Sequence, residues 1–348
     1  MIIDVSSDNV TQPTSEMREA MHHADLIGYG VPEDRLQARL EGLAAEITGK
    51  EATLLMPTGT QANLAAILCQ SEPGQEVVVG PDSHIYEQEL GGAGAIGGVM
   101  IRTWGSPGIP GLDAIQDAVE PGYRFPTTAS PELALVCLEN SHNASGGTVI
   151  SPETMRALCE VIRRKAPKIH LDGARIFNSA AAVQAEVWDL VEGADSVMFS
   201  LDKGLSAPFG AMLCGTAELV DQARKRRRML GGYIRKIGIY AAAGLVALQE
   251  MRDRIAEDNR RAASLGARLK RLQGISLLQD PIPTNLIMID VSDVGVEPDE
   301  FVARLKEEYG ILCHVYGRDV VRIAVHRHIG LEQEQIIAQA IEALLERL

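Results

Sequence analysis

Residues 195–215 read "DSVMFSLDKGLSAPFGAMLCG", two apolar runs on either side of one lysine, Lys203. Runs of this length and composition are typical of buried strands. A lysine ammonium is costly to remove from water, so burial lowers its pKa or requires a partner. One explanation is that the lysine is bound covalently rather than charged and free. The other segments of the sequence test this explanation.

Short apolar runs alternate with helical segments on both sides of this stretch. Helical spacing of apolar residues predicts helices at 34–49, 61–70, 83–90 and 151–166. Strands are expected at 52–60 (a strand that enters a glycine turn), 75–80, 97–104, 133–140, 168–173, 195–201 and 210–215. Continuous apolar strands interleaved with helices are typical of an α/β fold, with a mostly parallel central sheet covered by helices on both faces.

The pattern changes after about residue 240. A long helical tract, 239–274, leads into a compact α+β unit. Its predicted elements are a strand at 285–291, a helix at 298–310, strands at 311–317 and 320–326, and a terminal helix at 332–348. We therefore expect an N-terminal arm (1–25), a large α/β domain (26–245) and a small C-terminal α+β domain (246–348).

Composition excludes several classes of protein. The 348 residues carry 47 acidic side chains against 33 lysines and arginines, a net charge of −14, which argues against nucleic-acid binding. No apolar run reaches membrane-spanning length, and no signal peptide is visible, so we expect a cytoplasmic protein. Five scattered cysteines without a CxxC pair indicate neither a disulfide framework nor a zinc site, and we predict no metal.

The turn "PTGTQAN" (57–63) follows a strand and begins a helix. Its glycine, Gly59, permits a tight turn, and the free N–H groups of a helix start favour an anion. The same residues are equally consistent with an ordinary helix start, capped by Thr58 or Thr60.

Two further segments place polar side chains at expected strand ends. Asp172 in "IHLDGARIFNSAA" (169–181) could face a ring nitrogen and stabilise its protonated form, with Arg175 as an anion clamp. The alternative is a turn-capping aspartate that forms a salt bridge with Arg175. His84 in "PDSHIYE" is consistent with packing or capping, and also with an aromatic ring that stacks on a planar cofactor.

Together with Lys203, these strand ends offer an anion-binding turn, a carboxylate and a lysine. Pyridoxal phosphate requires this combination: a phosphate cradle, an aspartate on the pyridine nitrogen and a lysine in Schiff-base linkage. A nicotinamide dehydrogenase is disfavoured, because "GGAGAIGG" (91–98) follows a predicted helix rather than a strand.

Several longer segments are specific when taken together. They are "SDNVTQPTSEMREAM", "MPTGTQANLAA", "SHIYEQELGGAGAIGG", "CLENSHNASGGTVISPE", "HLDGARIFNSA" and "KGLSAP". In these segments and their order, the chain resembles the low-specificity L-threonine aldolases, within the β-eliminating-lyase group of fold-type-I pyridoxal phosphate enzymes. The resemblance implies an aspartate aminotransferase-like fold and cleavage of L-3-hydroxy-α-amino acids to glycine and an aldehyde.

The resemblance also implies residue roles. Lys203 is similar to the lysine that binds the cofactor, Gly59 and Thr60 to its phosphate cradle, His84 to the stacking ring and Asp172 to the partner of the ring nitrogen. It implies a catalytic role for Lys203, His84 and Asp172. The substrate carboxylate would be held by Ser7, Arg175 and Arg322, with Arg175 also at the cofactor site.

The segment "RRRMLGGYIR" (226–235) resembles a loop whose basic residues reach a cofactor phosphate in a neighbouring subunit. Arg228 and Arg235 are the candidates, whereas Arg224 to Arg227 are expected to be surface charge. The resemblance therefore implies shared active sites, a dimer at least and a homotetramer for the family.

Three departures from the family pattern concern the substrate. Asp202 precedes the lysine where serine is frequent, and "YGVPED" (29–34) alters the loop in which Tyr29 would contact the substrate. Arg124 stands where the family has a second histidine; it would be a poor base but could bind an anion on the substrate side chain.

Other functions stay open at this point. An acidic or aromatic 3-hydroxy amino acid could be the substrate, or the same scaffold could serve a β-eliminating lyase or an aminotransferase-like enzyme. A binding module without activity is the alternative from a different class. The presence of Lys203, Asp172 and Arg322 argues against it.

Overall fold

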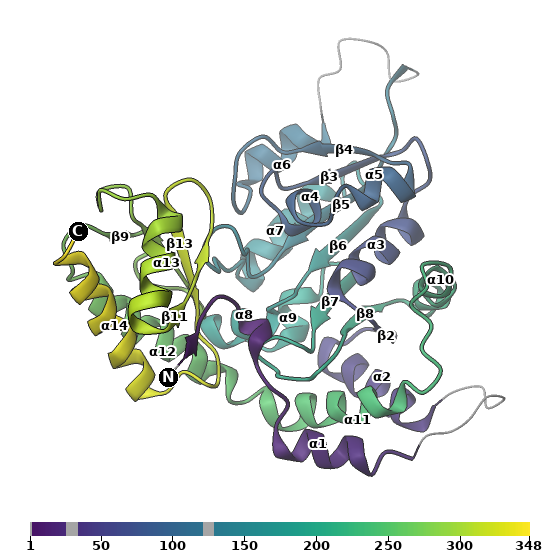
Figure 1. The fold of residues 1–348 in the computed structure, drawn as a ribbon. Helices are drawn as coiled ribbons and strands as arrows, with labels where there is room; N and C mark the ends of the chain where they lie inside the picture. The colour runs from purple at the N-terminus through teal and green to yellow at the C-terminus, as the bar shows by residue number, and fades with distance from the viewer. Residues whose placement is uncertain (1, 26–33, 121–128) are drawn as a thin grey trace.

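The computed structural model describes residues 2–25, 34–120 and 129–348 (Figure 1). A seven-stranded sheet with the order β2-β8-β7-β6-β5-β3-β4 forms its centre. The strands are β2 (Ala52–Met56), β3 (Glu76–Val79), β4 (Met100–Thr103), β5 (Leu133–Glu139), β6 (Lys168–Asp172), β7 (Ser196–Ser200) and β8 (Ala211–Gly215). Only β8 runs antiparallel to its neighbours in this sheet, β2 and β7. The predicted α/β fold with a mostly parallel sheet is confirmed.

Helices cover both faces of this sheet because successive strand residues point to opposite sides. In β7, Val197 and Phe199 belong to one hydrophobic core, whereas Met198 belongs to another. The first core includes residues of α1 (Ser15–His22), α2 (Arg35–Thr48), α6 (Leu112–Val119), α7 (Pro152–Ile162), α8 (Ile176–Val183), α9 (Val187–Val191) and α11 (Gly238–Val246). The opposite face is covered by α3 (Gly59–Gln70), α4 (His84–Glu87), α5 (Gly92–Gly97) and α10 (Ala217–Met229).

A second, antiparallel sheet has the order β12-β13-β10-β9. Its strands are β9 (Ser276–Leu277), β10 (Leu286–Asp290), β12 (His314–Val315) and β13 (Val320–Ala324), and it packs with α12 (Ile255–Leu269), α13 (Pro298–Tyr309) and α14 (Leu331–Leu345) around its own core. Strand β1 (Ile3–Asp4) pairs in parallel with β11 (Ile311–Leu312), and Ile3 and Val5 join this second core. The domain boundaries predicted from the sequence stay predictions.

The helical tract predicted at 239–274 is divided. A π-helical segment, Ala247–Met251, connects α11 to the turn before α12. The short helices α8 and α9, between β6 and β7, were missed because neither is long enough to show a clear period.

The basic run on α10 is not wholly a surface feature. Arg227 is 3% exposed and donates to the carbonyl oxygen of Leu55, and Arg224 lies 3.5 Å from a Glu41 carboxylate oxygen. The prediction of surface charge is therefore wrong for Arg227, because α10 packs closely on α3 and β2.

None of the helices in the described part of the chain is both long and apolar enough to cross a membrane. A cytoplasmic location stays a prediction.

Gly147, in the loop after β5, contacts Thr284, in the segment that precedes β10. It has φ +78°, and a Cβ there would lie 1.9 Å from Thr284 Oγ1, which donates to the Gly147 carbonyl at 3.0 Å. We expect Gly147→Ala to lower the free energy of unfolding by about 3 kcal/mol, the sum of left-handed strain and steric overlap. Urea unfolding measures the loss.

Gly105 is the matched control, with φ +93° and no atom within 4 Å of the point that a Cβ would occupy. Gly105→Ala incurs the backbone strain alone, about 1 kcal/mol. Equal losses for the two variants would contradict the steric argument.

Candidate active site

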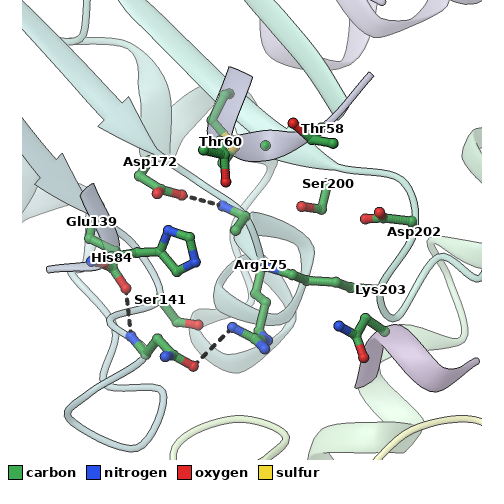
Figure 2. A pocket seen from close by; sticks show the side chains of 15 residues that line it. Thr58, Thr60, His84, Glu139, Ser141, Asp172, Arg175, Ser200, Asp202 and Lys203 are labelled. Carbon is green, nitrogen blue, oxygen red and sulfur yellow. Dashed lines mark hydrogen bonds between the residues drawn. The ribbon is translucent and has the colours of Figure 1, made fainter. Parts of the chain in front are cut away.

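A cavity of about 190 Å³ lies at the carboxyl ends of β5, β6 and β7, beside the first residues of α3 (Figure 2). Parallel strands end at the same edge of a sheet, which is where α/β proteins bind ligands. Six of the residues predicted from the sequence line it: Gly59, Thr60, His84, Asp172, Arg175 and Lys203. The other residues that line the cavity are Asn9, Thr58, Glu139, Ser141, Asn143, Ala174, Met198, Ser200 and Asp202.

Lys203 follows β7 and lines the cavity with its buried side chain. Burial, and then the charge of Arg175, lower the pKa of its amine, although Asp8, Asp172 and Asp202 act in the opposite direction. Within the described part of the chain, no group forms a hydrogen bond or ion pair with its Nζ. A lowered pKa favours the neutral amine, which is the form that attacks a carbonyl carbon.

Asp172 is the last residue of β6 and is almost fully buried. Its Oδ1 accepts a hydrogen bond from the Ala174 N–H at 3.0 Å, and its Oδ2 accepts from Asn63 Nδ2 at 2.8 Å. These donors stabilise a carboxylate, the form that can pair with a protonated ring nitrogen.

His84 begins α4, and its ring Nδ1 lies 2.9 Å from Glu89 Oε1. Burial acts to lower the pKa of His84, but the Glu89 hydrogen bond and the Asp172 charge outweigh it, so the pKa is raised. With Nδ1 donating to Glu89, the ring keeps Nε2 for exchange of a proton.

Glu139 ends β5 and fixes the loop on the far side of the cavity. Its two carboxylate oxygens accept hydrogen bonds from the backbone N–H groups of His84 and Asn143, both at 2.8 Å. Burial, and then the charge of Asp172, raise the pKa of Glu139.

Arg175 forms a bidentate ion pair with Asp8, with Nε and Nη2 at 2.7 and 2.8 Å from the carboxylate oxygens. Its partner is therefore Asp8 rather than Asp172, the partner considered in the sequence analysis. Arg175 and Arg322 also both donate from Nη1 to Asn143 Oδ1, at 3.2 and 3.1 Å. The two guanidinium groups thus meet at one side of the cavity, and the Arg322 Nε is buried without a partner among the described residues.

The start of α3 presents backbone to the cavity. Thr58 caps the helix by accepting from the Gln61 N–H, and Gly59 and Thr60 are its first residues. A Cβ at Gly59 would lie 2.8 Å from Met198 Cε, so the backbone approaches β7 closely here, and a larger residue would require the end of the Met198 side chain to shift. The first N–H groups of the helix, with no partners inside it, form an anion-binding end.

The remaining predicted site residues do not line this cavity. Ser7 accepts from the Asn9 N–H at 3.4 Å, Arg322 contacts the site through Asn143, and Arg228 lies over the Tyr233 ring at 4.8 Å. Arg235 is also outside the cavity lining. Tyr29 and Arg124 lie outside the described residues. The roles of all these residues stay predictions.

Sequence reasoning missed several residues that organise the site: Asp8, Asn63, Glu89, Glu139 and Asn143. A signal existed for Glu139, which ends an apolar strand as Asp172 does. The local sequence gives no such signal for Asp8 or Glu89. The partner of Asp8, Arg175, is distant in the sequence, and Asn63, a partner of Glu89, lies on another helix.

The fold is shared with a threonine aldolase and with a PLP-binding palmitoyltransferase of known structure. A threonine aldolase from Leishmania major, 20% identical, covers 99% of each chain with a TM-score of 0.82. A serine palmitoyltransferase from S. paucimobilis with a bound PLP–myriocin aldimine, 15% identical, covers 100% of this chain and 89% of its own with a TM-score of 0.76.

Sequence comparison is more specific than the fold. The beta-eliminating lyase family model matches residues 4–293. Low-specificity L-threonine aldolase 1 of Arabidopsis thaliana is 38% identical over 334 residues, 94% of this chain and 92% of that protein. The chain belongs to the low-specificity L-threonine aldolase family of beta-eliminating lyases, and the resemblance described above is confirmed.

The Asp8–Arg175 pair gives a pH-dependent prediction. Burial acts to raise the pKa of Asp8, but the Arg175 charge and hydrogen bonds outweigh it and hold this pKa well below its ordinary value of 3.8. Asp8→Asn leaves the arginine buried without a counter-charge, which we expect to cost about 3–5 kcal/mol of stability at pH 7. Denaturant unfolding measures the difference.

A carboxyl group whose pKa is lower in the folded state than in the unfolded state stabilises the folded protein at pH values above the unfolded-state pKa. This stabilisation is lost as the pH falls from the unfolded-state pKa through the folded-state pKa. The difference between the native protein and Asp8→Asn should therefore narrow below about pH 4. Glu153→Gln, at an exposed pair with Arg156, serves as the control and should leave the stability nearly unchanged at every pH, because solvent screens exposed pairs. A gap that is constant down to acidic pH would contradict the assignment.

Proposed function

We propose that this protein is a pyridoxal phosphate-dependent carbon–carbon lyase that cleaves L-3-hydroxy-α-amino acids such as threonine to glycine and an aldehyde. The single observation that carries the proposal is that Lys203, Asp172 and the start of α3 surround one cavity in a chain of this family. The substrate is an amino acid, as the names of its relatives indicate.

The residues present fit pyridoxal phosphate. Lys203 has an amine for its aldehyde that no other described residue pairs with, and Asp172 has the carboxylate for its ring nitrogen. Gly59 and Thr60 supply backbone donors for the phosphate, and the buried Ser141 hydroxyl, without a partner among the described residues, lines the same cavity. When bound, the cofactor supplies an electron sink for the pair released from the Cα–Cβ bond.

Positioning of the substrate is the task of the two arginines. Arg175 is held rigidly by Asp8, and Arg322 is oriented by Asn143 and the Ser6 carbonyl. A substrate carboxylate bound by these guanidinium groups would keep the Cα–Cβ bond in the orientation that favours cleavage, and such positioning supplies much of the rate of an enzyme.

Removal of the β-hydroxyl proton requires a base in the cavity. His84 is the candidate among the described residues, because Glu89 holds its Nδ1 proton and leaves Nε2 as the acceptor. An ordered water held by His84 would serve the same role. Ser7 and Tyr29 are proposed on the substrate side from the family resemblance, and Arg124 from its place where the family has a second histidine.

Glycine production tests the proposal. We expect the protein loaded with pyridoxal phosphate to release glycine from at least one of threonine, allo-threonine, phenylserine and 3-hydroxyaspartate, with diastereomers assayed separately. Lys203→Ala should lower kcat by at least about 10³-fold and abolish the visible absorbance band of the loaded protein. Ammonia and a keto acid as the products would instead identify a β-eliminating lyase, and a protein without a visible band would refute the cofactor.

We also propose that each active site is completed by a second subunit. Gln61, next to the anion-binding end of α3, donates to the Leu230 carbonyl at 3.3 Å, so the loop that contains Tyr233 lies close to the site. Leu90, Met229 and Tyr233 are 98%, 61% and 45% exposed, and an interface between subunits would bury them. A dimer in which Arg228 and Arg235 reach the partner's phosphate, assembled further into a homotetramer, would cover these exposed side chains.

Mixing of variant subunits tests the shared site. Lys203→Ala subunits and subunits with Arg228→Ala and Arg235→Ala should each be inactive. Reassociated in equal amounts, they should regain about a quarter of the native activity, because half of the dimers are hybrids with one intact site. If mass spectrometry detects hybrid dimers but no activity is recovered, Lys203, Arg228 and Arg235 act in the site of the same chain.

A further inference from the structure

A buried amide on α3 connects the two carboxylates of the site. Asn63 is 0% exposed, and its Nδ2 donates to Asp172 Oδ2 and to Glu89 Oε1, both at 2.8 Å. Asp172 is the proposed partner of the ring nitrogen, and Glu89 holds the proton of His84. One uncharged group therefore gives one hydrogen to each carboxylate.

Hydrogen bonds with residues outside the cavity lining fix the orientation of this amide. Asn63 Oδ1 lies 3.0 Å from His170 Nε2, and His170 Nδ1 lies 2.7 Å from Ser196 Oγ. Ser196 Oγ in turn accepts from Gln70 Nε2 at 2.7 Å. His170 is 0% exposed and does not line the cavity.

One arrangement of hydrogens satisfies the hydrogen bonds that link Asn63, His170 and Ser196. Burial lowers the pKa of His170 to about 4, so the ring is neutral and carries one N–H. Asn63 Oδ1 can only accept, which places that hydrogen on Nε2 and makes Nδ1 an acceptor of the Ser196 hydroxyl. A flipped Asn63 would present its carbonyl oxygen to two carboxylates and its NH₂ group to an N–H donor.

We propose that Asn63 is a positioning residue that holds the Asp172 and Glu89 carboxylates in their working orientation, and that His170 acts through it. The inference rests on the proposed function and deepens it. Without the amide, Asp172 keeps the Ala174 N–H as a donor, and Glu89 keeps the His84 ring. Two buried carboxylates with fewer donors become more basic and less well fixed.

Other titratable groups surround the same carboxylates and belong in any interpretation of pH. Those that interact electrostatically with Asp172 or Glu89 are His84, Cys137, Glu139, His170, Arg175 and Lys203. None of them donates to both carboxylates, so substitution of Asn63 changes a contact that the others cannot replace.

The expected signature is spectroscopic. A carboxylate that loses a donated hydrogen bond becomes more basic and draws the shared proton away from the ring nitrogen. A cofactor bound there would have a ring that withdraws fewer electrons, and its linkage to Lys203 would keep its proton to higher pH. The pH midpoint of the visible band therefore reports on Asp172 independently of turnover.

Four variants test the proposal, with pyridoxal phosphate as the probe. Asn63→Leu removes both donors, His170→Phe removes the group that orients them, and His170→Gln keeps an N–H donor toward Asn63. Thr53→Val is the control, since it removes a buried hydrogen bond to the Glu41 carbonyl elsewhere in the sheet. Measured are the Kd of the apoprotein for the cofactor, the pH midpoint of the visible band, and kcat and KM for threonine.

We expect Asn63→Leu and His170→Phe to raise the midpoint by about half a pH unit or more and to lower kcat about tenfold, with little change in KM. His170→Gln and Thr53→Val should behave like the native protein. If Asn63→Leu or His170→Phe fails to fold, Ser196→Ala, which removes the hydroxyl donor to His170, should shift the midpoint in the same direction by less.

Failure of this inference is distinct from failure of the proposed function. A native protein that forms no visible band with pyridoxal phosphate overturns the proposed function. A native protein that forms the band while Asn63→Leu, His170→Phe and Ser196→Ala leave its midpoint unchanged overturns the inference alone. A His170→Gln variant as impaired as His170→Phe would also overturn it, because a purely structural role would be the remaining explanation.

Discussion

Desolvation of one amine, that of Lys203, is the constraint on which the rest of the site depends. An amine buried at a strand end destabilises the fold unless the charges around it balance one another and are held in place. Arg175 adds a positive charge nearby, and its bidentate pair with Asp8 compensates that charge within the same buried region. The result is an amine with a lowered pKa and no partner among the described residues, which is suited to covalent chemistry rather than to an ion pair.

Three parts of the chain converge on Asp8 to produce this balance. Arg175 comes from the segment after β6, Asn285 precedes β10, and Asp8 itself follows β1. Because β1 pairs with β11 and Ile3 packs in the second core, the arm is anchored away from the large sheet and extends to its edge. The ion pair thus links the two sheets as well as stabilising the site.

Local pattern was enough to predict the large sheet and the polar residues at its strand ends, including Lys203 and Asp172. It fails where a partner is remote: the alternative interpretation pairs Asp172 with Arg175, three residues away, but Arg175 binds Asp8, 167 positions earlier. Arg227 and Asn63 were missed for the same reason, since burial of a polar side chain depends on which elements pack against it. Family resemblance supplied roles for Ser7 and Arg322 that no periodicity contains, and those roles stay untested.

The pairing of β1 with β11 has a consequence for biosynthesis. Residues 3 and 311 must both have left the ribosome before this parallel ladder can form, although the large sheet can assemble much earlier. Until then the Asp8 segment has no anchor, and Arg322 and Asn285 have not yet taken their places. A nascent chain that has not yet reached these residues would therefore hold a folded central sheet with an incomplete, inactive pocket, so that chemistry begins only after residue 322 has been synthesised.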